Sequence, residues 1–223
     1  LPDRSVNCSV TSPPYFQQRQ YLPSDHADRP LEIGQEKTPE EYIANLVAVF
    51  KEVRRILRDD GCLWLVIGDT WRDKQLLGIP WRLALALQAD GYVLRDENIW
   101  WKINGIPGSA TDRCTRAHET VFLLSKKPAY YFDHEAIREP AVKGAAGSHF
   151  HTGKTARHQL GRASEKERTE DGMRNKRSVW PVATVPSDHE HLATFPPDLI
   201  EPCILAGSPP GGVVLDPFLG SGT

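Results

Sequence analysis

The sequence predicts an α/β fold with a mainly parallel central sheet. Two observations predict it. Apolar runs typical of strands alternate with amphipathic segments typical of helices, and this alternation favours parallel strands joined by helices. One run, CLWLVIGD, is continuously apolar, as expected of a strand that is buried on both faces. With 223 residues, of which 39% are apolar, the chain is predicted to be one large domain or one domain with an insertion.

The first strand and the first helix carry clear local signals. The run VNCSVT, residues 6–11, is short and partly β-branched, and it stops at the Pro-Pro pair of TSPPY. The segment 38–61 predicts a helix, since Thr38 suits the N-cap, Pro39 the first helical position and Glu41 the far side of a capping box. Gly61 is predicted to end this helix. Its apolar face consists of Ile43, Leu46, Val47, Phe50, Val53 and Leu57.

The later elements follow in the same alternation. The segment 62–69 predicts a strand, and 80–91 a helix that begins at Pro80 and ends at Gly91. Two further strands are predicted at 93–102 and 118–127, with a loop from 103 to 117 between them. Near the end we expect an extended segment at 178–185 and a helix at 196–208. A buried strand that ends at Asp216 and runs into a glycine loop is then expected at 211–223.

A basic segment interrupts this pattern from Lys143 to Arg177. It carries nine Lys and Arg residues against four Asp and Glu residues, whereas the whole chain has a net charge of -2. It has too few apolar residues to form a core, so we expect a mobile insertion that orders on a partner. Its charge favours a polyanion, with a solvated basic loop as the alternative. The chain is therefore divided into residues 1–142, the insertion 143–177 and residues 178–223.

The cysteines and histidines give no sign of a disulfide framework or a metal site. There are four cysteines, none in a C-x-x-C pair, and Cys8 and Cys62 lie in apolar runs, which indicates reduced thiols in a cytoplasmic protein. His149, His151 and His158 follow no common ligand spacing, so no metal is predicted. The sequence contains neither a signal peptide nor an apolar stretch long enough to cross a membrane.

Two short motifs gain meaning from each other. TSPPY alone is most often a turn that ends a strand, with a packed tyrosine, and FLGSG alone is weak evidence for anything beyond a turn. With TSPPY early and DPFLGSGT late, the chain resembles the β-class of S-adenosylmethionine-dependent DNA amino-methyltransferases, in which the catalytic motif comes first. LVIGDTW, IWWK, HETVFLLSKK and HLATFPPDLIEPC match the same family in the same order.

This resemblance implies a Rossmann-like methyltransferase fold whose mainly parallel sheet includes an antiparallel hairpin. It also implies S-adenosyl-L-methionine as the cofactor and double-stranded DNA as the partner, in a bacterial, archaeal or phage-encoded protein. The insertion 143–177 becomes the target-recognition region. Whether the protein forms a homodimer, and whether a cognate restriction endonuclease accompanies it, stay open.

The chemistry of the catalytic motif agrees with this function. The amino group of a base is a poor nucleophile because its lone pair is delocalised, and hydrogen-bond acceptors on its hydrogens can turn the lone pair out of conjugation. The hydroxyl of Ser12 can be one acceptor. The carbonyl of Pro13 can be another, directed by the locked φ angles of Pro13 and Pro14. The ring of Tyr15 can stack on a base rotated out of the duplex.

The resemblance also assigns binding residues. Cofactor contacts are expected from Thr194, Phe195, Asp216, Phe218, Gly220 and Gly222, although core packing is an equal alternative for Phe195. DNA contacts are expected from Lys154, Arg157, Arg162, Arg174, Lys176 and Arg177. Asp69 is expected to line the pocket or to cap a helix. His118 and Glu119 resemble a recurring pair of the family to which no role is assigned.

The resulting hypothesis is methyl transfer to cytosine N4, with adenine N6 as the alternative base. A DNA-binding remnant without catalysis and an RNA or protein methyltransferase are the alternatives outside that class. The chain begins at Leu1 without an initiator Met and ends inside a loop, which indicates a fragment. The acid that binds the cofactor ribose in the family is expected beyond Thr223, so weak cofactor binding by residues 1–223 alone is predicted.

Overall fold

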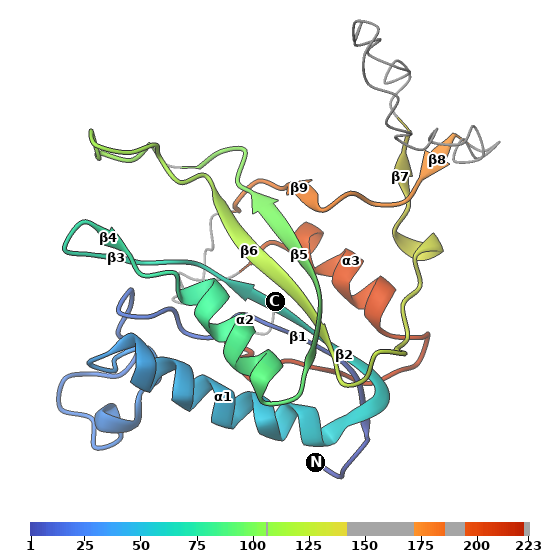
Figure 1. Cartoon of the computed structure of the whole chain (residues 1–223), viewed down its shortest axis with the longest axis horizontal. Helices are drawn as coiled ribbons and strands as arrows, with labels where there is room; N and C mark the ends of the chain where they lie inside the picture. Colours follow the sequence, from blue (N-terminus) through green and yellow to red (C-terminus); the bar gives the residue numbers. More distant parts are fainter. Residues whose placement is uncertain (106, 142–171, 186–194, 221–223) are drawn as a thin grey trace, which may run out of the picture.

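The computed structural model describes residues 1–105, 107–141, 172–185 and 195–220. A six-stranded sheet forms the centre of the molecule, with α1 and α2 on one face and α3 on the other (Figure 1). In order across the sheet, the strands are β10 (Val214–Leu215), β1 (Val6–Thr11), β2 (Leu57–Ile67), β6 (His118–Ser125), β5 (Val93–Trp101) and β9 (Val179–Pro181). The helices are α1 (Pro39–Ile56), α2 (Ile79–Ala89) and α3 (Pro197–Gly207).

The predicted fold class is confirmed. β10, β1 and β2 run parallel, as do β5 and β9, whereas β6 is antiparallel to both β2 and β5. The expected antiparallel hairpin is therefore the pair β5 and β6. Two small hairpins lie outside the sheet, β3 (Trp71–Arg72) with β4 (Gln75–Leu76), and β7 (Glu139–Pro140) with β8 (Met173–Arg174). Single turns of 3-10 helix occupy Arg29–Leu31 and Glu135–Ile137.

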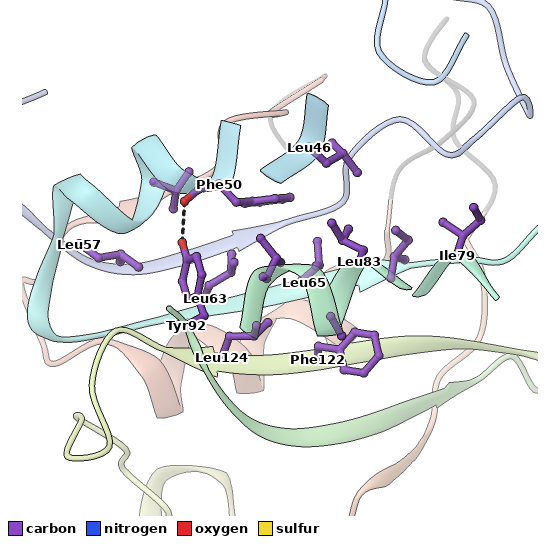
Figure 2. Close-up of a cluster of buried hydrophobic side chains, with 14 of the residues drawn as sticks. Leu46, Phe50, Leu57, Leu63, Leu65, Ile79, Leu83, Tyr92, Phe122 and Leu124 are labelled. Atoms are coloured by element: carbon purple, nitrogen blue, oxygen red, sulfur yellow. Dashed lines mark hydrogen bonds between the residues drawn. The ribbon is translucent and has the colours of Figure 1, made fainter. Parts of the chain in front are cut away.

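Strand β2 has a core on each side, as its continuous apolar run predicts. Leu63, Leu65 and Ile67 face the α1 and α2 side, whereas Trp64 and Val66 face the α3 side. Figure 2 shows the first of these clusters, where side chains from α1, α2, β2 and β6 interdigitate. Alternation of side chains along a strand places successive residues on opposite faces, so one strand supports both layers.

The first helix begins as predicted and ends earlier. Thr38 accepts a hydrogen bond from the Glu41 amide, and the Glu41 side chain accepts one from the Thr38 amide, which is a full capping box. The helix stops at Ile56, because Leu57 is extended and already pairs with Val6 in the sheet. The prediction that the helix reaches Gly61 is therefore wrong.

Gly61 has a different role from the predicted one. It lies within β2, close to where the register between β1 and β2 shifts. A Cβ there would lie 3.0 Å from the backbone oxygens of Asn7 and Arg58. The lack of a side chain lets two strands approach at a bulge, and a helix-ending glycine gives the same signal in a sequence.

The prediction of a buried strand before Asp216 is also wrong. Val213 and Val214 are exposed, and Leu215 is only partly buried. Within the described residues β10 pairs with β1 alone, so it is an edge strand of this sheet. Its apolar sequence made a central position the natural expectation.

All four cysteines are outside disulfide bonds; Cys8, Cys62 and Cys203 are buried, whereas Cys114 is exposed. The Cys62 thiol lies 3.8 Å from the Cys8 sulfur, which is far beyond a disulfide bond. At that distance the Cys62 thiol donates a hydrogen bond to the Cys8 sulfur. This hydrogen bond and, after it, burial raise the pKa of Cys8. Within the described parts of the chain, no helix has the length and apolarity needed to cross a membrane.

Replacing Gly207, the last residue of α3, by alanine is expected to destabilise the fold. A Cβ at this position would lie 2.7 Å from the Cys8 sulfur and 2.9 Å from the Cys62 sulfur. Overpacking of this kind costs about 1–3 kcal/mol. Urea unfolding followed by circular dichroism measures the change, and Glu201→Ala serves as the control, because Glu201 is an exposed residue of the same helix. An unchanged midpoint for Gly207→Ala would show that α3 can shift away from the sheet.

Candidate functional site

The candidate site lies at one edge of the sheet, where several strands end together. Parallel β10, β1 and β2 have their carboxyl ends there, and antiparallel β6 has its amino end beside them. Ligands of open α/β sheets bind at the carboxyl ends of strands. The segment TSPPY leaves β1 at this edge, so the motif predicted to be catalytic lies among these strand ends.

The Pro-Pro corner is held from two sides. The hydroxyl of buried Tyr42, in α1, donates to the carbonyl of Pro14 over 2.8 Å. Gly34, at a φ of +99°, packs against the same corner, where a Cβ would lie 3.3 Å from the Pro14 Cβ. Within the described residues, no hydrogen bond reaches the carbonyl of Pro13. Tyr42 thus fixes the second proline and leaves the first carbonyl as an acceptor.

Tyr15 is fixed by a hydrogen bond and by close packing. Its hydroxyl donates to a carboxylate oxygen of Glu119 over 2.6 Å, and the Ser12 hydroxyl lies 3.4 Å from the Tyr15 oxygen. Glu119 also forms an ion pair with Lys102, and both side chains are mostly buried. A Cβ on Gly68 would lie 2.7 Å from the Tyr15 ring. Only glycine at this position lets the ring lie against β2.

Burial and charge keep the tyrosine hydroxyl protonated. Burial first, and then the neighbouring Glu119 carboxylate, raise the pKa of Tyr15 well above its ordinary value. A neutral hydroxyl donates to the carboxylate, and the ammonium of Lys102 balances that charge. The Lys102 nitrogen also lies 4.5 Å from the centre of the Trp100 ring. The row Ser12–Tyr15–Glu119–Lys102 is therefore a connected polar network beside the corner.

The Asp69 carboxylate binds the first amide of α2 and forms an ion pair with Arg116. One carboxylate oxygen accepts from the amides of Thr70 and Ile79, the first residue of α2. The other lies 3.6 Å from a guanidinium nitrogen of Arg116. The N-cap of α2 is Gly78, so Asp69 is not the N-cap, but its carboxylate binds the first amide of the helix.

The second motif lies next to the first. The Thr11 hydroxyl donates to the carboxylate of Asp216, which also accepts from the Phe218 amide over 2.9 Å. Burial raises the pKa of Asp216, while the hydrogen bond from Thr11 opposes that shift. Gly220 is exposed at a φ of +57°, and a Cβ there would have only one neighbour within 4 Å. The strand end is thus tied to β1, and open backbone follows it.

The other residues predicted to bind the cofactor or DNA pack in the core, form ion pairs or ring contacts, or lie outside the described residues. Phe218 packs edge-to-face on Phe50, and Phe195 packs against the core on the α3 side. Thr194, Gly222, Lys154, Arg157 and Arg162 lie outside the described residues, as do the three histidines of the basic segment. Of the predicted DNA-binding residues that are described, Arg174 and Arg177 both pair with Glu139, and Lys176 lies over the Trp180 ring.

Sequence reasoning found no role for Glu119 and did not consider Lys102, Tyr42 or Gly34. A signal for Glu119 was nevertheless present. An antiparallel strand starts where its parallel neighbours end, so the first residues of β6 must lie beside the ends of β1 and β2. The bond from Tyr42 to Pro14 spans 28 residues and leaves no local sequence pattern.

The comparisons with known proteins agree on one family. A family model described as "DNA methylase", of the N6 and N4 type, matches residues 6–223. The type II methyltransferase M.XycI of Xanthomonas campestris pv. cyanopsidis is 40% identical over the whole chain, which spans 73% of that relative.

Solved structures share the fold at low sequence identity. PvuII DNA methyltransferase (cytosine-N4-specific) is similar over 96% of this chain and 68% of its own, with a TM-score of 0.65 and 16% identity. The M1.HpyAVI–SAM complex is similar over 98% of this chain and 74% of its own, with a TM-score of 0.53 and 20% identity. At these identities the likeness supports the Rossmann-like arrangement of the sheet.

Proposed function

Because the chain belongs to the DNA methylase family of N6 and N4 amino-methyltransferases, we propose that it methylates the N4 amino group of cytosine in double-stranded DNA. S-adenosyl-L-methionine is the methyl donor, since solved methyltransferases with this fold are described as complexes with it. The observation that carries the proposal is Ser12 at the end of β1, beside a Pro13 carbonyl that the Tyr42 bond to Pro14 leaves available. The resemblance to the family favours cytosine N4 for a serine at this position, and the similar PvuII enzyme is described as cytosine-N4-specific.

The residues at the end of β10 fit this cofactor. Asp216 anchors the turn through Thr11 and Phe218, and exposed Gly220 leaves its backbone open to a ligand. The sulfonium of the bound cofactor supplies an electrophilic methyl group, so the protein needs neither a metal nor a nucleophile of its own.

The protein has to position one amino group and support its change of charge. A target base must leave the duplex to reach the sheet edge. The Ser12 hydroxyl and the Pro13 carbonyl accept hydrogen bonds from its two amino N–H groups, which directs the lone pair and stabilises the positive charge that develops on nitrogen. The ring of Tyr15, held by Glu119, provides the stacking surface. The basic segment 143–177 stays our proposal for the target-recognition region.

Nucleoside mass spectrometry tests the proposal. DNA treated with the purified protein and S-adenosyl-L-methionine is digested, and N4-methylcytosine is the expected product. N6-methyladenine would overturn the choice of base and keep the reaction class. DNA binding without either product, even at high cofactor concentration, would favour a binding module over an enzyme.

Replacing Gly220 by valine is expected to abolish cofactor binding. A β-branched residue is strained at a φ of +57°, and its side chain would cover the open backbone. Isothermal titration calorimetry of the full-length protein with S-adenosyl-L-methionine measures the loss. The control is Gly211→Val, because Gly211 also has a positive φ but lies before β10, with nothing within 4 Å of a Cβ. Equal binding by wild type and Gly220→Val would remove this loop from the cofactor site.

A further inference from the structure

Two projecting segments lie together beyond the carboxyl end of β2, outside the groups described above. One is the β3–β4 hairpin, and the other is the loop between β5 and β6; both extend past the sheet on the same side (Figure 1). Arg113, from the loop, stacks on the hairpin residue Trp71, with the guanidinium carbon 4.2 Å from the ring centre. Arg116 lies over the same ring at 5.5 Å. We call the hairpin and the loop together the two-arm surface.

The charge of the two-arm surface is positive. Residues 70–78 and 102–118 contain five Lys and Arg residues against two Asp residues. Two of the five cations pair with acids beside the site, Lys102 with Glu119 and Arg116 with Asp69. Within the described residues, Lys74 and Arg113 form no ion pair, and both are exposed. The exposed acids of these segments are Asp73 and Asp112. Each lies next to a cation in the sequence, and the cations of the two-arm surface outnumber its acids.

The turn of the hairpin is conformationally costly. Arg72 pairs with Gln75, so Asp73 and Lys74 form a two-residue turn, with φ angles of +51° and +63°. Turns of this kind favour Asn-Gly because both central residues need a positive φ. Here the second position holds a lysine instead. A strained residue that persists at a surface tip points to a role beyond the fold.

The hairpin is also bonded directly to the residues that follow the Pro-Pro corner. The Thr70 hydroxyl donates to the Phe16 carbonyl, and the Gln18 amide donates to the carbonyl of Asp69. Arg72 donates to the side chain of Gln17 over 2.5 Å. Arg72 and the base of the hairpin are thus fixed relative to TSPPY, which sets the place of the hairpin beside a flipped base.

We propose that the two-arm surface grips the phosphate backbone of the DNA strand beside the flipped base, with Lys74 and Arg113 as the phosphate contacts. The proposal rests on the proposed function, since it takes duplex DNA as the substrate. Trp71 holds the Arg113 guanidinium over its ring, so less side-chain freedom is lost when the guanidinium meets a phosphate. Contacts to phosphates do not read the base sequence, so this surface would bind DNA in the same way whatever sequence the protein recognises.

The salt dependence of DNA binding tests this surface. Fluorescence anisotropy with a labelled duplex gives the dissociation constant of the purified protein over a series of KCl concentrations. Each phosphate contact contributes about 0.9 to the slope of log affinity against log salt, so Lys74→Gln with Arg113→Gln should make the slope shallower by about 1.8. Replacing Arg113 by lysine instead of glutamine should keep most of the contribution of residue 113 to the slope, because the positive charge is kept.

The matched control is Arg58→Gln, at the amino end of β2 and so at the opposite edge of the sheet. Its slope should equal that of the wild type. An unchanged slope in the double variant, or an equal loss in Arg58→Gln, would overturn the proposal. The outcome is separate from the base identity, because a product other than N4-methylcytosine contradicts the proposed function and leaves the salt slopes as measured.

Discussion

Ser12→Ala is expected to lower kcat by about a hundredfold or more, as losing one positioned hydrogen-bonding group does in other enzymes. In the proposed mechanism, the hydroxyl is one of two acceptors for the amino hydrogens of the base, and the Pro13 carbonyl cannot replace it. The affinity for DNA should hardly change, because phosphate contacts dominate it. Single-turnover methylation with nucleoside mass spectrometry measures the rate.

Ser9→Ala is the matched control for Ser12→Ala. Ser9 lies in β1, the strand that leads into Ser12, is buried, and has a hydroxyl with no hydrogen-bond partner among the described residues. Removing that hydroxyl should leave the methylation rate unchanged. If Ser12→Ala methylates at the wild-type rate, the acceptor role of the serine is wrong.

Tyr15→Ala is expected to lower kcat/KM by roughly five- to 150-fold, the equivalent of about 1–3 kcal/mol of stacking on the flipped base. The loss should be visible in steady-state methylation of duplex DNA. A substrate with the target base opposite a mismatch should recover part of it, because that base leaves the duplex more easily.

Tyr15→Phe separates the ring from the hydroxyl. Phenylalanine keeps the stacking surface and loses the 2.6 Å bond to Glu119, whose charge stays paired with Lys102. The expected loss is smaller than for alanine. A phenylalanine variant as impaired as the alanine variant would show that the hydrogen-bond network, and not the ring face, is what the reaction needs.

The sequence predicted best where a local signal had one meaning. β1 ends at Thr11, as the Pro-Pro pair requires, and the capping box of Thr38 and Glu41 placed the start of α1. Gly61 was misleading, because glycine ends helices and also permits bulges between strands. β10 was misleading too, since an apolar run does not say whether a neighbour covers it.

The sequence could predict the two motifs of the candidate site, but not the distant residues that hold those motifs in place. Ser12 and Asp216 were found as ends of apolar runs, and the register of β1 with β10 and β2 brings those ends together. Their supports come from distant segments. The bonds of Tyr42 to Pro14 and of Tyr15 to Glu119 depend on how α1 and β6 pack on the sheet, and no spacing in one sequence reports that packing.

The bond between Thr11 and Asp216 joins residues 205 positions apart in the chain. Two neighbouring parallel strands, and not a continuous stretch of backbone, therefore unite the halves of the site. A rearranged gene that encoded the β10 segment ahead of β1 would place the same side chains at the same points, provided that the loops could span the new connections. Searches for related enzymes should accordingly accept the two motifs in either order and weigh their pairing in space above their succession in the gene.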